Sequence, residues 1–247
     1  MKDATREQFI EHGLAEFPKE ACGLIVVRKG KEMYIPCRND ATDPEQHFVL
    51  SGKDYADAED RGDIIAVAHT HPNASSKPSD ADRTACEESG LPWYILSIMQ
   101  DLDNPPAVGE MEYIEPCGYV APLVGRTFVH GIHDCYTIIR DWYKQERDII
   151  LPNFNREDQW WENGGNLYME NFPKAGFEEA KGKPEVGDVI LMQVRSSVPN
   201  HAGVYLGDGV MLHHMYGRLS TREVYGGYWA EVTVKFLRLK DTDEKDA

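Results

Sequence analysis

Two histidines at the end of a short apolar run constrain the fold of this chain more than any other feature. Asp63–Ala68 is rich in branched and small apolar residues, as expected for a buried strand, and His69 and His71 follow it with one residue between them. Because alternate residues of a strand face the same side, the two imidazoles are expected to point together. The sequence therefore predicts a strand that delivers two metal-ligating side chains to one place.

A carboxylate follows from the next predicted element. Ser79 precedes a predicted helix over 80–90, and Asp82 lies in its first turn. An ordinary interpretation makes Ser79 and Asp82 a capping box and the histidines polar surface. However, two imidazoles and one carboxylate also suffice for a catalytic zinc, which leaves its fourth position to water. The joint pattern favours a Zn2+ site formed by His69, His71 and Asp82.

The order His-x-His, seven further residues and Ser-x-x-Asp resembles the JAMM motif of the JAB/MPN metallopeptidases. The resemblance covers roughly the first 110 residues and implies an α/β domain with a mixed sheet and helices. It further implies that the two His and the Asp bind zinc and that Ser79 assists the tetrahedral intermediate.

The segment around Glu20 resembles the family's Glu-bearing segment, in which an acidic residue precedes an apolar strand. The resemblance implies that Glu20 activates water and passes its proton to the leaving amine. Zinc chemistry uses such a carboxylate, because the metal lowers the pKa of the water that the carboxylate deprotonates. Without the motif, a glutamate before a strand is typical of ordinary surface.

Composition excludes several classes of partner. The net charge of −16 argues against nucleic-acid binding, which needs clustered Lys and Arg. No apolar stretch approaches the roughly 20 residues of a membrane span, and the N-terminus lacks an apolar export signal. Five cysteines with no Cys-x-x-Cys pair predict a reducing compartment without a disulfide framework. The acidic tail over 241–246 is predicted to be disordered.

Proline and glycine cluster near 115–122, which predicts two domains over 1–117 and 118–247. The first mixes helices and strands, which suits an α/β fold, and the second places a helix before antiparallel strands, which suits an α+β fold. Helices are expected over 5–17, 53–61, 80–90 and 135–147. Strands are expected over 22–28, 33–36, 64–69, 93–99, 186–194, 201–206, 210–214 and 231–238, with a further short strand at 112–114.

The second half contains a candidate nucleophile, Cys135. Asp134 is a plausible helix N-cap, which places the thiol at the start of a helix. Backbone N–H groups and the helix dipole lower the pKa of a thiol at this position, and an ionised thiol is a strong nucleophile. The alternative is a buried free cysteine that packs as a small apolar side chain.

A hairpin supplies candidate bases for this thiol. His201 opens a predicted strand, Gly207–Gly209 forms a turn, and His213 and His214 end the return strand. If Asp208 is the centre of the turn, His201 and His213 are diagonal neighbours on one face, with His201 as base and His213 as the orienting group. A two-residue turn would shift the register and favour His214 instead.

Three features of this half resemble the NlpC/P60 cysteine peptidases over about 118–240. They are Asp134-Cys135 opening a helix, Val186–Ile190 as the strand before the histidine, and His201–Gly207 followed by His213. The resemblance implies a papain-like α+β fold in which Cys135 is the nucleophile, His201 the base and His213 the third polar residue.

This half departs from the NlpC/P60 pattern in two places. Tyr136-Thr137 stands where most members have Ser-Gly, which affects substrate fit. The family also places a Tyr upstream of the nucleophile. Phe128–Gly131 occupies that region here, with His130 as the candidate substitute.

The order of the two domains resembles that of the tail assembly protein K family of lambda-like phages. This implies a tail-tip peptidase acting on peptidoglycan stem peptides or on a tail protein, with other tail-tip proteins as partners. The expected locations are the host cytoplasm during tail assembly and the virion tail tip. Two alternatives remain at this point: a non-catalytic assembly factor with vestigial hydrolase domains, and an enzyme that trims ubiquitin-like conjugates, which leaves Cys135 without a role.

Overall fold

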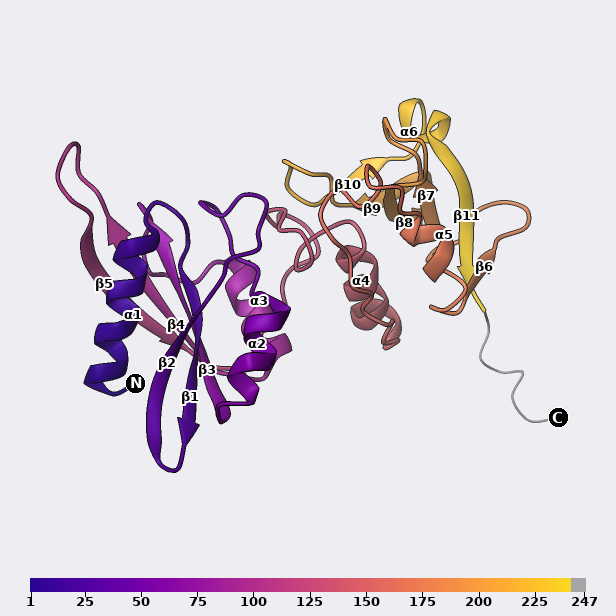
Figure 1. Cartoon of the computed structure of the whole chain (residues 1–247). Coiled ribbons are helices and arrows are strands. Elements are labelled where there is room, and N and C mark those ends of the chain that lie inside the picture. Colours follow the sequence, from indigo (N-terminus) through magenta and orange to yellow (C-terminus); the bar gives the residue numbers. More distant parts are fainter. Residues whose placement is uncertain (241–247) are drawn as a thin grey trace. The chain divides into compact units, whose positions relative to one another are not determined.

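The computed structural model describes residues 1–240, so the predicted disorder at 241–246 lies outside the described residues. The chain divides into two compact units, Met1–Val120 and the part that begins at Ala121. Figure 1 shows each unit as one sheet with its own helices. We call them the N-terminal unit and the C-terminal unit.

The N-terminal unit is built on a five-stranded mixed sheet with the order β2-β1-β3-β4-β5. Strands β3 and β4 are parallel, and the other neighbouring pairs are antiparallel. The elements are α1 (Asp3–Glu16), β1 (Cys22–Arg28), β2 (Lys31–Cys37), α2 (Gly52–Glu59), β3 (Asp63–Pro72), α3 (Asp80–Ser89), β4 (Trp93–Met99) and β5 (Ala107–Ile114). The predicted α/β fold with a mixed sheet is confirmed.

Helices cover both faces of this sheet, with α1 on one side and α2 and α3 on the other (Figure 1). The alternation of side chains along the strands explains why. On β3, Val67 joins the apolar cluster that includes Ala58 of α2 and Cys86 of α3, whereas Ala66 and Ala68 join the cluster around Phe9 of α1. His69 continues the row of Val67 and therefore faces the side of α3.

The C-terminal unit contains a six-stranded antiparallel sheet with the order β10-β9-β8-β7-β11-β6. A helix precedes the run of strands, so the predicted α+β class is confirmed. The elements are α4 (Thr137–Arg147), α5 (Leu167–Asn171), β6 (Phe177–Glu179), β7 (Val189–Met192), β8 (His201–Gly207), β9 (Val210–His213), β10 (Thr221–Val224), α6 (Tyr228–Glu231) and β11 (Thr233–Leu239).

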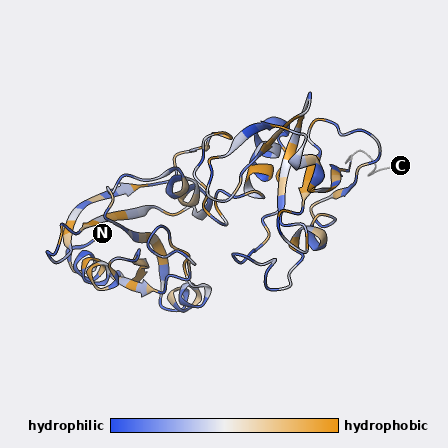
Figure 2. Ribbon diagram, turned by 90° about the horizontal axis from the view of Figure 1, so that it is seen from above, coloured by the Kyte–Doolittle hydropathy of each residue, from blue (hydrophilic) through white to orange (hydrophobic). Residues whose placement is uncertain are grey.

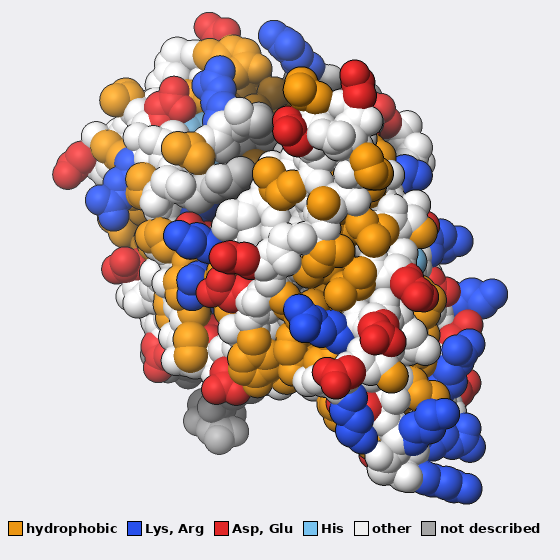
Figure 3. Space-filling view, turned by 90° about the vertical axis from the view of Figure 1, so that its left-hand side faces the viewer, with side chains coloured by type: hydrophobic (Ala, Val, Ile, Leu, Met, Phe, Trp, Pro, Cys, Tyr) orange, Lys and Arg blue, Asp and Glu red, His pale blue; other side chains and the backbone are white. Residues whose placement is uncertain are grey.

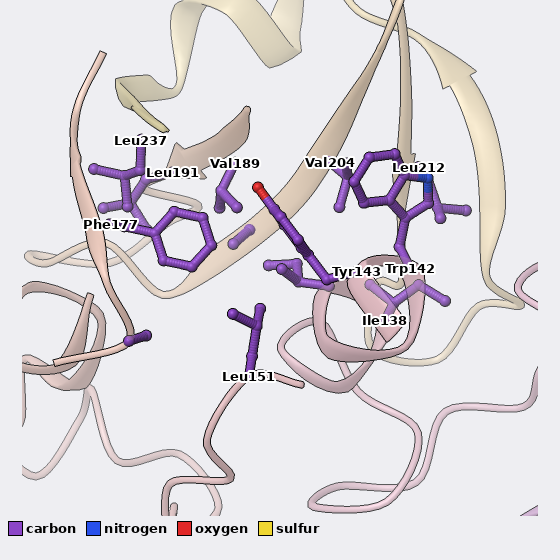
Figure 4. Packing of buried hydrophobic residues seen from close by; sticks show 13 residues of the cluster. Ile138, Trp142, Tyr143, Leu151, Phe177, Val189, Leu191, Val204, Leu212 and Leu237 are labelled. Atoms are coloured by element: carbon purple, nitrogen blue, oxygen red, sulfur yellow. The ribbon is translucent and has the colours of Figure 1, made fainter. Parts of the chain in front are cut away.

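The core of this unit lies between α4 and the sheet. Figure 4 shows Ile138, Trp142 and Tyr143 of α4 facing Val189, Leu191, Val204 and Leu212 of the strands. The spacing of the three α4 residues places them on one face of the helix. Full burial of each such side chain contributes about 1.5–3 kcal/mol, so this contact fixes the start of α4 relative to β8.

The short elements are those that the sequence did not predict. Helices α5 and α6 and strands β6 and β10 contain three to five residues each, too few for a hydrophobic period to be visible. The strand predicted over 186–194 is confined to Val189–Met192. The longer helices and strands of both units were predicted within a few residues of their observed ends, except for β5. This strand was expected only over 112–114 but spans Ala107–Ile114.

Apolar residues concentrate in the strands and on the inner sides of the helices, whereas the connecting segments are mostly hydrophilic (Figure 2). One face of the molecule carries acidic, basic and apolar side chains interspersed (Figure 3). Over the described residues, none of the helices has both the length and the apolar composition needed to cross a bilayer.

Two candidate active sites

The end of β3 and the start of α3 bring the three predicted metal ligands together. His69 Nε2 and His71 Nε2 lie 3.1 Å apart. The Asp82 carboxylate approaches these two atoms at 3.2 and 3.4 Å respectively. The three residues offer ligand atoms that all lie within 4.8 Å of one another. The side-chain alternation along β3 is therefore sufficient to explain the convergence of the two imidazoles.

Ser79 and Asp82 also form the capping box that the ordinary interpretation expected. Asp82 N–H donates to Ser79 Oγ, and Ser79 N–H donates to Asp82 Oδ2 at 2.7 Å. The Ser79 hydroxyl donates to the same oxygen at 2.7 Å. The cap fixes the rotation of the Asp82 carboxylate toward the histidines, so capping and ligand placement are compatible.

The ionisation of these side chains reflects their mutual contacts. Burial alone would raise the pKa of Asp82, but His69, His71 and Ser79 hold it below its usual range. Burial lowers the pKa of His69. Burial also acts to lower the pKa of His71, but hydrogen bonds to Asp82 and to the Ser75 carbonyl outweigh it, and the net shift is upward.

The donor set fits zinc. His71 Nδ1 lies 2.7 Å from the Ser75 carbonyl oxygen, so it carries the proton and leaves Nε2 free as a ligand. His69 is fully buried, and its Nδ1 has no hydrogen-bond partner within residues 1–240. Two imidazole nitrogens and one carboxylate match the ligands of catalytic zinc sites.

Glu20 is buried beside this cluster, with 7% of its surface exposed. Burial raises its pKa to about 8, with His71 and Asp82 as electrostatic neighbours that oppose one another. Thr70, between the two histidines, holds this segment in place. Its hydroxyl accepts from Ala21 N–H at 2.8 Å, and its own N–H donates to the Ala21 carbonyl at 2.9 Å. Sequence patterns did not predict this role for Thr70.

In the C-terminal unit, Asp134 organises the start of α4. Its carboxylate accepts from Tyr136 N–H and Thr137 N–H, and its carbonyl accepts from Ile138 N–H. Asp134 therefore acts as the cap that the sequence predicted, although regular helix begins only at Thr137. Arg156 forms an ion pair with the same carboxylate at 2.6 Å.

Cys135 follows this cap, but its ionisation differs from the prediction. Burial, together with the neighbouring Asp134 carboxylate, raises the pKa of Cys135 to about 11. The predicted lowering was wrong for this structure because desolvation outweighs the N–H groups at the helix start. The thiol lies 3.1 Å from the Tyr168 hydroxyl and also accepts a hydrogen bond from Ala202 N–H.

The two predicted histidines meet as diagonal neighbours. Gly203 pairs with His213, and His201 Nε2 lies 3.0 Å from His213 Nδ1. The turn that achieves this differs from the prediction. It is a two-residue turn at Asp208 and Gly209, both with positive φ. A bulge between Tyr205 and Gly207 then restores the register, because the extra residue offsets the short turn.

Gly203 makes room for this arrangement. A Cβ at this position would lie 2.8 Å from the Leu212 carbonyl oxygen and 2.9 Å from His213 Cβ. Both distances are shorter than packed atoms allow. The absence of a side chain thus lets β8 and β9 approach closely enough for the two imidazoles to contact each other.

Glu223 and Trp229 also belong to this site, and the sequence did not predict them. Glu223 Oε2 lies 2.9 Å from His213 Nε2. The indole ring of Trp229 packs edge-on against His213, with 4.7 Å between ring centroids. Glu223 lies on β10 and Trp229 on α6, two elements too short to be recognised from periodicity. The one available signal was the alternation of Thr221–Val224.

The thiol opens onto a cavity of about 380 Å³, which His201 and His214 also line. Most of the remaining wall is apolar or aromatic: Phe128, Tyr136, Ile139, Phe154, Trp160, Trp161, Leu167, Tyr168, Phe172, Phe177 and Tyr216. His130 lines the cavity as well, but its Nε2 contacts the Arg156 carbonyl at 3.0 Å. Tyr168, downstream of the nucleophile, supplies the hydroxyl beside the thiol.

Comparisons with known proteins match each unit to a different family. The model of prokaryotic homologs of the JAB domain matches residues 2–108, and the NlpC/P60 family model matches residues 125–238. The tail tip assembly protein K of Escherichia phage N15 is 39% identical over 249 residues, 100% of this chain and 99% of that protein. The chain belongs to the tail tip assembly protein K family.

The tail tip assembly protein K of Escherichia phage lambda is 40% identical over 190 residues, 76% of this chain and 88% of that protein. Among solved structures, an NlpC/P60 family protein from Bacillus cereus is 13% identical, with a TM-score of 0.34, over 94% of this chain and 66% of that protein. All three candidate metal ligands lie inside the JAB match, and Cys135, His201 and His213 lie inside the NlpC/P60 match.

Proposed function

We propose that this chain is a phage tail-tip assembly protein with two peptide-hydrolysing centres, a zinc centre in the N-terminal unit and a thiol centre in the C-terminal unit. The hydrogen-bonded pair of His201 and His213 beside the Cys135 cavity carries the proposal. A nucleophile and a base that is itself oriented by a third group are the common requirement of cysteine peptidases.

The geometry supports a proposed role for each residue of the thiol centre. The Nε2 atom of His201 is hydrogen-bonded to His213, so the Nδ1 atom of His201 is the nitrogen available to take the Cys135 proton. The sulfur then attacks a peptide carbonyl carbon, and the C–N bond breaks as His201 returns the proton to the leaving amine. A water molecule, deprotonated by His201, hydrolyses the resulting thioester and regenerates the thiol.

In the N-terminal unit, the nitrogens of His69 and His71 and the carboxylate of Asp82 would hold zinc. When bound there, zinc would polarise a carbonyl and lower the pKa of a water molecule. Glu20, which is buried beside these residues, would act as the proton acceptor of this centre and would deliver the proton to the leaving amine. Ser79, whose hydroxyl donates to Asp82, orients that carboxylate, and the family resemblance implies that it also assists the tetrahedral intermediate.

The family resemblance implies that the thiol centre cleaves peptidoglycan stem peptides. We expect purified full-length protein to release muropeptides from isolated cell walls, and Cys135→Ala to abolish this release. His71→Ala serves as the matched control, because it alters the other centre. If release persists in Cys135→Ala but stops with a chelator, wall cleavage belongs to the zinc centre and the assignment fails.

The cavity favours a tail protein as a second candidate substrate. Arg156 supplies the one guanidinium or ammonium group among the lining residues that the structure describes, and Asp134 is paired with it. The carboxylates of a stem peptide would therefore find no free cation in the cavity wall formed by these described residues, whereas an apolar peptide side chain would contact its aromatic residues. Faster cleavage of a γ-D-glutamyl–diaminopimelate peptide than of Leu- or Phe-containing peptides would exclude this candidate.

As the relatives' name suggests, we expect the protein to act with other tail-tip proteins. The locations we propose are the host cytoplasm during assembly and then the tail tip. A non-catalytic assembly role is the rival function. In a complementation assay, the double variant Cys135→Ala with His71→Ala should fail to produce infectious particles if hydrolysis is required. Full infectivity of that variant would favour the purely structural role.

A further inference from the structure

A continuous row of hydrogen-bonding groups leads from the surface to the thiol centre. It begins at the Glu223 carboxylate, which is partly exposed, with 41% of its side chain accessible, and passes through His213 to His201. Both imidazoles are buried. The three residues come from β10, β9 and β8, three adjacent strands of one sheet.

The Glu223 carboxylate at the end of this row determines the direction of each hydrogen bond in it. An ionised carboxylate only accepts, so His213 Nε2 must carry a proton and donate to Glu223. His213 is neutral when its other nitrogen, Nδ1, has a free lone pair, and this atom then accepts from His201 Nε2–H. With its proton on Nε2, His201 has a lone pair on Nδ1. One carboxylate thus determines the tautomers of two histidines, and leaves the second as a base.

The surroundings of His201 and His213 also favour the neutral form of both imidazoles before the thiol loses its proton. Burial lowers the pKa of both His201 and His213, so an imidazolium here is disfavoured. Arg218 repels positive charge on His213, whereas Glu223 attracts it.

The Glu223 carboxylate has two hydrogen-bond donors, His213 and Trp229. Burial would raise the pKa of Glu223, but the hydrogen bonds from His213 and from the indole N–H of Trp229 lower it. Glu223 is therefore the anion that offsets the proton His201 receives from the thiol.

We propose that Glu223 is a positioning residue of the thiol centre, which sets the tautomers of His213 and His201 and stabilises the imidazolium formed when Cys135 loses its proton. This inference rests on the proposed function of the thiol centre. It adds Glu223 to the three residues Cys135, His201 and His213, on a strand that the sequence did not predict. It also adds Trp229, which donates a hydrogen bond to Glu223.

Nitrogen-15 NMR of the histidines and the alkylation rate of Cys135 by iodoacetamide test the proposal in the full chain. In Glu223→Ala, we expect His213 to lose its preference for the Nε2–H tautomer and Cys135 alkylation at pH 7 to slow by roughly tenfold, which corresponds to one pKa unit. Glu223→Gln can still accept from His213, so it should retain the tautomer but show the slower alkylation.

Glu231→Gln is the matched control, because this exposed α6 residue has the same charge and forms no side-chain hydrogen bond to either histidine in the described structure. Amide spectra of each variant check that the fold is retained. An unchanged tautomer in Glu223→Ala, or an alkylation profile in both Glu223 variants that superimposes on that of the unmodified protein, would overturn the proposal. Neither measurement needs a substrate, so a failure to hydrolyse peptides would reject the proposed function without affecting this test.

Discussion

The two candidate centres are assembled in different ways. The candidate metal centre takes its three residues from one strand and the helix that follows it, so His69, His71 and Asp82 are close in sequence and in space. The thiol centre joins the start of α4 to a hairpin far along the chain. A local centre depends on strand alternation and one helix cap, whereas the distant one depends on helix–sheet packing, a bulge and a glycine.

The largest effect should come from removing the thiol. We expect Cys135→Ala to lower peptide hydrolysis by the C-terminal unit about a thousandfold or more, because no other described group lining the cavity is a comparable nucleophile. The zinc content of the same variant should stay unchanged. A parallel loss of zinc would show that the two centres are coupled and would end the view that they are separate.

The converse variant tests the local centre. His71→Ala removes one of three ligands, so we expect the zinc content of the purified protein to fall from about one ion per chain to near zero. His12→Ala, a histidine on α1 outside the cluster, should retain zinc. Atomic absorption provides the measurement. Full zinc occupancy in His71→Ala would place the ion elsewhere.

A smaller effect should follow from filling the space at Gly203. In Gly203→Ala, the new methyl group would press against the Leu212 carbonyl oxygen and His213. We expect a loss of about 1–3 kcal/mol in the free energy of unfolding and a roughly tenfold lower kcat with a similar KM. Chemical denaturation measures the free energy of unfolding, and steady-state kinetics measure kcat and KM. Equal activity would mean that the contact between the imidazoles is dispensable.

The smallest effect concerns acid stability. His214 is fully buried, and burial lowers its pKa to about 4. The folded-state pKa of His214 lies below the unfolded value of 6.5, so burial of the neutral imidazole stabilises the fold fully above pH 6.5. This stability is lost as the pH falls from 6.5 toward 4. We therefore expect His214→Phe to lose less unfolding free energy between pH 7 and pH 5 than the unmodified protein, by about 1–2 kcal/mol.

The measurement for this variant is urea denaturation at both pH values. His130→Phe is a suitable control, because His130 is only half-buried and hydrogen-bonded. Identical pH dependence in the His214→Phe and unmodified chains would show that the buried imidazole accommodates a proton in the folded state.

Sequence patterns predicted the local centre more completely than the distant one. Period-two alternation through His69 and His71, with a capping box at Ser79, was enough to predict that the three candidate ligands lie together. For the hairpin, alternation predicted the pairing of Gly203 with His213 only under an assumed turn, and the observed turn is shorter. The compensating bulge includes Gly207, but a glycine beside a turn is too common to predict a bulge.

The thiol's surroundings were beyond sequence reasoning for a different reason. Helix-start arguments favoured an ionised Cys135, but desolvation by the surrounding residues has the larger effect on its pKa. Tyr168 lies on a five-residue helix, and Glu223 on a four-residue strand. Such elements are fixed by tertiary packing, so their contribution to the site becomes visible only in three dimensions.

The bulge in β8 decides which of two adjacent imidazoles reaches His201. With the Asp208–Gly209 turn unchanged, straightening the strand at Leu206 would slide the pairing by one position and set His214, not His213, opposite Gly203. Because the two histidines are adjacent in the chain, a slipped hairpin would still offer a ring nitrogen to His201. Tandem imidazoles would thus keep a ring nitrogen near His201 if the loop changed in length by one residue.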